Sequence, residues 1–153
     1  MQAPSLSRDP VITIAAEVAQ PQKFGRSMGF ERRCVPILGG TVSGAIIGHI
    51  LPGGTDWQRI FDDGSTEIEA HYAIETGDGA LVEVHSAGIR SGPPEVMAAL
   101  LAGEPVDASQ VYFRTAIRLI SSAPQHRALT RKMHVGVGRR EPSRVLIDVH
   151  SID

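Results

Sequence analysis

The chain has 153 residues, enough for one domain with a real core, because domains most often contain about 100 to 150 residues. Its 15 lysines and arginines nearly balance 17 aspartates and glutamates, and no basic run is long enough to follow a phosphate backbone, so we expect no nucleic-acid partner. The single cysteine, Cys34, excludes an intrachain disulfide and a cysteine-based metal cluster. The apolar run at residues 11–16 is too short for a membrane span, so we expect a cytoplasmic protein with no membrane partner.

Glycines and prolines separate short segments rich in Val, Ile and Thr, which is typical of an antiparallel β protein. We predict one domain over residues 1–153 with a flexible N-terminal arm at residues 1–9. Because so many strands in a small domain need protected edges, the pattern favours a closed antiparallel β-barrel over a sandwich, an all-β fold with one short helix. The predicted strands cover residues 11–18, 32–38, 43–51, 66–76, 80–90, 110–120, 133–139 and 144–152.

The stretch LPGGTDWQ, residues 51–58, places the only tryptophan, Trp57, and a carboxylate, Asp56, directly after a Pro-Gly-Gly turn. Gly53 and Gly54 allow a tight turn with positive φ, which would leave Asp56 and Trp57 at a barrel rim where an aromatic wall desolvates the carboxylate. The structural alternative is that Trp57 plugs the end of the barrel and Asp56 caps the turn through backbone N–H groups. The residues alone leave both interpretations open.

The segment EIEAHYAIETGDGALVEVHSAGI, residues 67–89, alternates strictly on both sides of Gly-Asp-Gly and predicts a hairpin. A three-residue loop at 77–79 pairs Thr76 with Ala80 and sets His71 directly opposite His85. A two-residue turn would place Glu83 on the apolar side, so the pattern favours the longer loop. The polar face, which includes Glu69, His71 and Glu83, either meets solvent, as such faces usually do, or lines a cavity that holds an acid and base pair.

The segment PPEVMAALLAG, residues 93–103, predicts the one helix, with prolines at its start and Gly103 after its end. It either covers one end of the barrel as a lid or simply packs there. No HExxH or EF-hand pattern is present, and HVGVGRR is not followed by a helix as a dinucleotide fingerprint requires. We therefore expect no metal and no cofactor. Arg114, inside VYFRTAIRL, either binds an anionic substrate or points outward.

Five segments in this order resemble the bacterial and fungal domain-of-unknown-function family 3237, also called the UPF-0311 group. They are GGTVSGAIIGHILPGGTDWQ, EIEAHYAIETGDGALVEV, GIRSGPPEVMAALLAGEPVD, VYFRTAIRL and HVGVGRR. The resemblance implies an antiparallel barrel of lipocalin or streptavidin appearance that often forms oligomers. It also associates some fungal relatives with cofactor-free ring closure of aromatic polyketides. The family's Pro-Gly-Gly-Ala-Asp-Trp matches residues 52–57, its Tyr-Phe-Arg matches residues 112–114, and its Asp-Ala-Arg-Tyr corresponds to residues 69–72, where Glu69 and His71 differ.

Together these features predict a cofactor-independent lyase, isomerase or cyclase that acts on a small, partly aromatic metabolite held in the barrel. The general base would be Asp56 or Glu69 and the proton donor His71 or Tyr72; because His71 and Tyr72 lie on opposite faces of a regular strand, only one of them can face the cavity. The expected substrate-binding residues are Trp57, Tyr112 and Arg114, with Arg114 stabilising negative charge. The alternatives are a barrel that binds a small molecule without changing it and a structural homo-oligomer. Whether the protein is an enzyme or a carrier, we expect a homo-oligomer.

Overall fold

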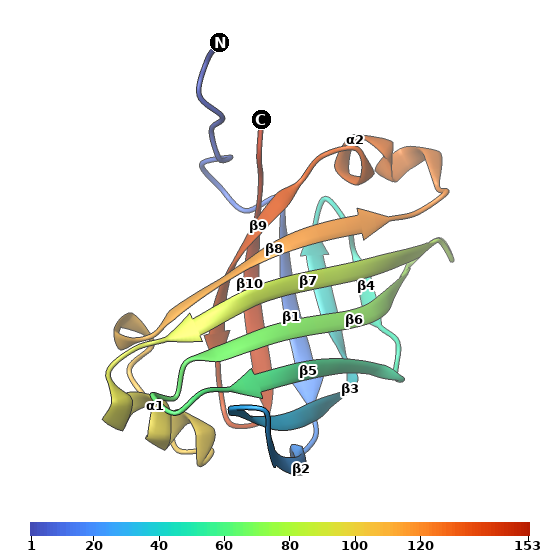
Figure 1. The fold of residues 1–153 in the computed structure, drawn as a ribbon. Coiled ribbons are helices and arrows are strands. Elements are labelled where there is room, and N and C mark those ends of the chain that lie inside the picture. Colours follow the sequence, from blue (N-terminus) through green and yellow to red (C-terminus); the bar gives the residue numbers. More distant parts are fainter.

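The computed structural model describes residues 1–153, and its strands form one antiparallel sheet that closes on itself (Figure 1). The elements in chain order are β1 (Ile12–Val18), β2 (Gln22–Ser27), β3 (Phe30–Gly44), β4 (Gly48–Ile50), β5 (Gly54–Ile60), β6 (Thr66–Thr76), β7 (Leu81–Ser91), α1 (Pro94–Leu101), η1 (Ala108–Gln110), β8 (Tyr112–Ile120), η2 (Pro124–His126), α2 (Arg127–Thr130), β9 (His134–Arg140) and β10 (Arg144–Ser151).

The sheet closes because β1 pairs with β10 on one side and with β3 on the other. The long strand β3 has two partners on each side: its first half lies between β2 and β5, and its second half lies between β1 and β4. Strands β4 and β5 therefore follow one another in the same position of the barrel, between β3 and β6. The predicted antiparallel β-barrel is confirmed.

One predicted strand requires correction, and two strands were not predicted. Residues 43–51 are not one strand, because β3 ends at Gly44, whose φ of 105° lets the chain turn before β4 begins at Gly48. Strand β2 was not predicted because all six of its residues are exposed. Its sequence, QKFGRS, therefore shows no alternation of apolar and polar side chains. Strand β5 was not predicted because two of its inward side chains, Asp56 and Gln58, are polar, which hides the period of two.

The β6–β7 hairpin has the predicted register. The backbone N–H of Thr76 donates to the carbonyl of Ala80, and His71 pairs with His85. The inner face of the hairpin carries Ile74, Val82 and Val84, which are fully buried. Its outer face is largely in solvent, so the usual interpretation of an acid-rich sheet face is confirmed.

The predicted helix is α1, which lies at the end of the barrel where β7 ends and β8 begins (Figure 1). It ends in a Schellman motif: Glu104 N–H donates to the carbonyl of Ala99 and Gly103 N–H to that of Leu100, with Gly103 at φ 82°. Met97 is fully buried against the β5–β6 turn. The four-residue helix α2 was not predicted. None of the helices has the length and apolar character needed to span a membrane.

The barrel interior has an apolar part and a polar part. Seventeen buried side chains form one apolar cluster, and they come from β1, β3, β4, β6, β7, β8, β10 and, with Ile46, the turn between β3 and β4. Inward-facing polar side chains on β3, β5, β7 and β9 lie nearer to α1, and they form the candidate site described next. The N-terminal arm runs beside the C-terminal end of the chain, where Leu6 pairs with Ile152, Ser7 N–H donates to the carbonyl of Ser151 and Asp153 N–H donates to that of Ser5.

Candidate functional site inside the barrel

Strand β5 carries the carboxylate of the Pro-Gly-Gly motif into the barrel. Side chains alternate along the strand, so Asp56 and Gln58 point inward while Trp57 points outward. Gln58 is only 2 % exposed, whereas Trp57 is 38 % exposed. The Trp57 ring therefore does not desolvate Asp56 at a rim, and that expectation is wrong. The barrel interior desolvates the carboxylate instead.

A short hydrogen-bond chain holds one side of this carboxylate. Arg33 Nε donates to Gln58 Oε1 at 2.7 Å, and Gln58 Nε2 donates to Asp56 Oδ2 at 2.8 Å. The other oxygen, Asp56 Oδ1, is buried and has no partner in the protein. Burial raises the pKa of Asp56, although the Gln58 hydrogen bond and the charges of nearby arginines, chiefly Arg90, oppose the rise.

Positive charge exceeds negative charge in this part of the interior. Three guanidinium groups, on Arg33, Arg90 and Arg140, act on the carboxylate of Asp56, and Glu31 is the other acidic group that acts on Arg33. Arg90 is only 2 % exposed, makes no ion pair within 4.0 Å, and lies 5.4 Å above the Phe113 ring. Burial lowers the pKa of Arg90 to about 10, which leaves it cationic at neutral pH. The site is therefore built to favour a negative charge.

Tyr72, from β6, shares the interior with Asp56. Its hydroxyl is buried without a hydrogen-bond partner, and burial together with the charge of Asp56 raises its pKa above the usual value. Gly54 makes room for this tyrosine: a β-carbon at Gly54 would lie 2.5 Å from the β-carbon of Tyr72. The preceding glycine, Gly53, has a φ of 107°, so the positive φ expected in the Pro-Gly-Gly turn is present.

Seven buried side-chain N and O atoms have no hydrogen-bond partner in the protein. Three of them belong to His126 and His134, and the other four are Asp56 Oδ1, Tyr72 Oη, Arg90 Nε and Thr115 Oγ1. Buried polar groups are normally paired, and an unpaired one costs about 1 to 3 kcal/mol. The atoms of Asp56, Tyr72, Arg90 and Thr115 come from four consecutive strands around the barrel, β5, β6, β7 and β8. A cavity of about 10 Å³ beside Arg140, lined also by Leu100 of α1 and by Phe113, has room for about one water molecule.

The other predicted site residues lie on the outer face of the sheet. The Arg32 guanidinium lies 4.9 Å from the centroid of the Trp57 ring, and the Phe24 ring lies 5.5 Å from it at an angle of 32°. Tyr112 is 56 % exposed, and the Arg114 guanidinium lies 5.2 Å from its ring. Arg114 is separated from Asp56 by the sheet, so the cations that act on this carboxylate are Arg90, Arg33 and Arg140 instead.

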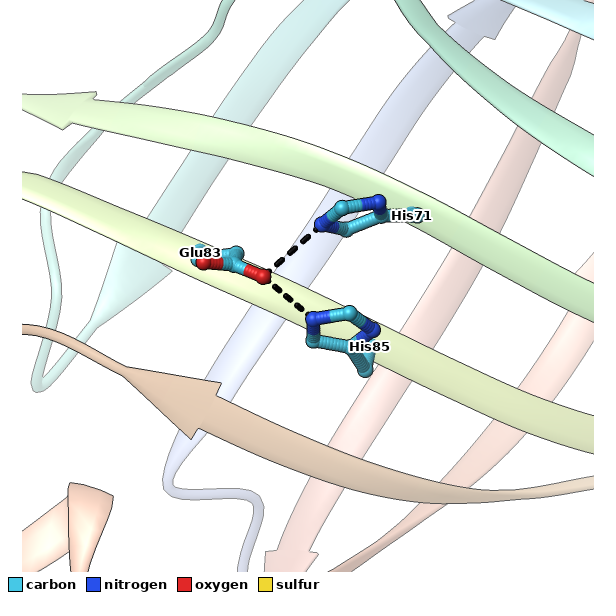
Figure 2. A group of neighbouring side chains, drawn as sticks. All are labelled: His71, Glu83 and His85. Carbon is cyan, nitrogen blue, oxygen red and sulfur yellow. Dashed lines mark hydrogen bonds and ion pairs between the residues drawn. The ribbon is translucent and has the colours of Figure 1, made fainter.

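Glu69 and His71 are also exposed, on the outer face of β6. Figure 2 shows that His71 and His85 both point toward one carboxylate, Glu83. Hydrogen bonds from His85 and His71 lower the pKa of Glu83. The structure therefore divides the predicted residues: Asp56 and Tyr72 lie inside the barrel, and Glu69, His71, Trp57, Tyr112 and Arg114 lie outside.

The sequence analysis did not select Arg33, Gln58, Arg90 or Arg140. A signal for Arg90 was present, since the alternation that puts Val82 and Val84 inside the barrel also puts Arg90 inside when it is continued along β7. Arg140 and Gln58 had no comparable signal, because their strands have polar residues or glycines at inward positions.

Comparison with known proteins gives a consistent result. Residues 6–152 match the model of a family described as "Protein of unknown function (DUF3237)". A UPF0311 protein of Bradyrhizobium diazoefficiens is 41% identical over 149 residues, which cover 97% of this chain and 98% of the relative. A crystal structure of a conserved protein of unknown function from Rhodopseudomonas palustris has a TM-score of 0.90 at 42% identity and covers 99% of this chain and 100% of its own.

A more distant structural neighbour is described as an enzyme from Penicillium herquei. It has a TM-score of 0.73 at 16% identity and covers 100% of this chain and 97% of its own. At this level of identity the likeness shows the fold alone.

Proposed function

The chain belongs to the DUF3237 family, and from this membership and the charged interior of its barrel we propose that it is a cofactor-free acid–base enzyme, a lyase or isomerase acting on a small metabolite that carries or develops negative charge on oxygen. The observation that carries the proposal is the set of unpaired buried atoms on Asp56, Tyr72 and Arg90. The cytoplasmic location and the homo-oligomer stay predictions.

The electrostatic part of the proposal rests on the excess of guanidinium groups. Arg90 has no ion-pair partner within 4.0 Å, and its Nε atom is buried without a hydrogen-bond acceptor. Donors fixed in a dry interior stabilise an oxyanion far more than donors in water do. A carboxylate, phenolate or enolate oxygen would supply both the missing acceptor and the missing charge.

The proton-transfer part rests on Asp56 and Tyr72. Burial raises the pKa of Asp56 above its usual value, which makes its carboxylate a stronger base than an exposed one. The raised pKa of Tyr72 keeps its hydroxyl protonated, so it donates a hydrogen bond to a developing oxyanion. Positioned acid and base groups each contribute about 10²- to 10⁴-fold to a rate.

We infer that a ligand reaches this site from the end of the barrel covered by α1, because the cavity there is lined by Arg140, one of the cations that act on Asp56. The cavity there is about 10 Å³, so a metabolite needs the side chains around Leu100 and Phe113 to move aside. Helix α1 is short and buries only Met97 and Leu100, so few buried contacts would be lost if it moved away from the barrel.

The proposal is tested with two probes that differ in one property. Phenylpyruvate and benzoate both offer a carboxylate and an aromatic ring, but only phenylpyruvate has an enolisable CH₂ group. We expect both to raise the melting temperature of the wild-type protein, and we expect the protein to accelerate exchange of the CH₂ protons with D₂O, followed by NMR.

Variants assign the roles. Asp56→Asn is expected to keep benzoate binding and to lose about 10²- to 10⁴-fold of the exchange rate, whereas Arg90→Gln is expected to lose binding. Arg114→Gln, on the outer face, is the matched control and should behave as wild type. Binding without accelerated exchange would favour the carrier alternative. If neither probe binds, the interior charges serve the fold and the proposal fails.

A further inference from the structure

The outer face of the β6–β7 hairpin holds a second cluster, separate from the barrel interior. His71 of β6 pairs directly with His85 of β7, and Glu83 precedes His85 by two residues, so all three side chains leave the same face of the sheet (Figure 2). Their carboxylate and imidazole groups are exposed to solvent.

The two imidazoles are aimed at one point. Their rings stack with centroids 4.0 Å apart and an angle of 20° between the planes. His71 Nε2 lies 2.8 Å from Glu83 Oε2, and His85 Nε2 bonds to the same oxygen. One donor atom from each residue lies within 4.8 Å of the others. Because donors on one tetrahedral zinc ion are about 3.4 Å apart, small side-chain rotations would bring all three into ligand positions.

We propose that His71, Glu83 and His85 form a binding site for a divalent transition-metal ion, with Zn²⁺ as the best match. Two neutral imidazoles and one carboxylate are borderline ligands that suit Zn²⁺, and the same set leaves a fourth position open in catalytic zinc sites. In this site the Glu83 carboxylate shifts enough to make room for the metal and stays one of its ligands, and the metal lies close to the point at which both Nε2 atoms are directed.

The surroundings agree with a cation at this position. Glu69 lies two residues from His71 on the same face of β6, and its charge adds to that of Glu83. Arg118 pairs with His85 across β7 and β8 and partly opposes the cation. Both residues line an open groove of about 480 Å³ that also contains His71, His85 and Trp57. Glu83 lines a second open groove of about 560 Å³ that also contains His71, so solvent or a fourth ligand has access to the cluster.

The metal site stands on its own, independent of the proposed acid–base function. The sheet lies between the two clusters, and no residue belongs to both. The absence of an HExxH or other linear motif does not bear on it, because strand register rather than sequence spacing brings the ligands together.

The test is a calorimetric titration of the full chain with Zn²⁺ after treatment with a chelator and its removal. We expect one ion per chain for the wild type. His71→Ala and His85→Ala should each weaken binding by at least about 10- to 100-fold, the loss seen even when an outer-shell partner of a metal ligand is removed. Cu²⁺ gives a second readout, since it should quench the fluorescence of Trp57, the only tryptophan, in the wild type and not in the His71→Ala/His85→Ala double variant.

His49→Ala is the matched control, because His49 is an exposed histidine that also faces a glutamate, Glu75, at 3.7 Å. It should bind Zn²⁺ as the wild type does, and so should Asp56→Asn, which alters only the interior. Circular dichroism checks that each variant is folded. The proposal is overturned if the double variant binds Zn²⁺ as tightly as the wild type, or if the wild type shows no binding with Zn²⁺ up to about 1 mM.

Discussion

Asp56 and Glu83 belong to the same sheet, yet their environments shift their pKa values in opposite directions. Asp56 faces the interior, where burial raises its pKa and one oxygen has no partner. Glu83 faces solvent, where hydrogen bonds from His85 and His71 lower its pKa. The comparison teaches that the face of a strand, and not the type of residue, decides whether the pKa of a carboxyl group is raised or lowered.

The largest expected effect contrasts two adjacent residues on opposite faces of β8. Leu119→Ala empties a fully buried position and should lower the free energy of unfolding by about 2 to 5 kcal/mol. Ile120→Ala, at a position that is 46 % exposed, should change it by no more than about 0.5 kcal/mol. Urea denaturation measures both, and equal losses would mean that the interior is not packed as described.

A smaller effect is expected from Gly54→Ala, which tests the fit between the Pro-Gly-Gly turn and Tyr72. The new β-carbon would lie 2.5 Å from the β-carbon of Tyr72, and overpacking of this kind costs about 1 to 3 kcal/mol. Gly77→Ala is the control in the hairpin loop, because nothing lies within 4 Å of its β-carbon position. Thermal unfolding compares the two, and an unchanged Gly54→Ala protein would contradict the close approach.

The pH dependence of Asp56→Asn sharpens the contrast between the carboxylates. Because the folded-state pKa of Asp56 is raised, the wild type gains stability from its protonated form below the unfolded pKa of about 3.9 and loses it as pH rises through the folded pKa. The stability of Asp56→Asn relative to the wild type should therefore increase over this range, by about 1.4 kcal/mol for each pKa unit of the shift.

Asp63→Asn gives the opposite sign. Hydrogen bonds from Ser65, first from its backbone N–H, lower the pKa of Asp63, so its contribution is present above the unfolded pKa and is lost as pH falls. Denaturation curves collected between about pH 3 and pH 8 reveal both trends, because this pH range includes the reference pKa values of carboxyl groups. If the difference in stability between Asp56→Asn and the wild type did not depend on pH, the pKa of Asp56 would not be shifted by its environment.

The smallest effect is expected from Glu83→Gln without added metal. The Glu83 carboxylate and its two histidine partners are exposed, and exposed ion pairs contribute little because solvent and salt screen them. The melting temperature should change less than in Gly54→Ala, and added salt should reduce the change further. A loss as large as that of Leu119→Ala would show that the outer cluster holds the hairpin together.

Much of the fold could be predicted from the sequence where alternation is clean. The β6–β7 hairpin satisfies the period of two with strongly apolar inner residues such as Ile74 and Val82, so its register and its His71–His85 pair followed from the sequence. Helix α1 was predicted because its prolines and Gly103 mark both ends. Strand β5 was missed because two of its inner side chains, Asp56 and Gln58, are polar, and these same two residues belong to the candidate site.

The candidate site could be predicted only in part for the same reason. Asp56 and Tyr72, which lie inside the barrel, were among the predicted site residues. Glu69 and His71 were included in the same prediction because titratable residues are most frequent on the outer face of β6. Which side of a barrel wall a side chain occupies depends on how all strands close, a property of the whole chain. Arg33, Arg90 and Arg140 come from three separate strands and meet only after closure.

Closure itself has a consequence for how this protein forms in a cell. Strand β1, near the start of the chain, completes its pairing only when β10, which ends at Ser151, lies beside it. During synthesis the edge of β1 that pairs with β10 therefore stays unpaired until almost the whole chain has left the ribosome. This free edge is able to pair with other chains. Such long-range pairing makes folding slow, so conditions that delay synthesis of the last strands should promote aggregation of the nascent protein.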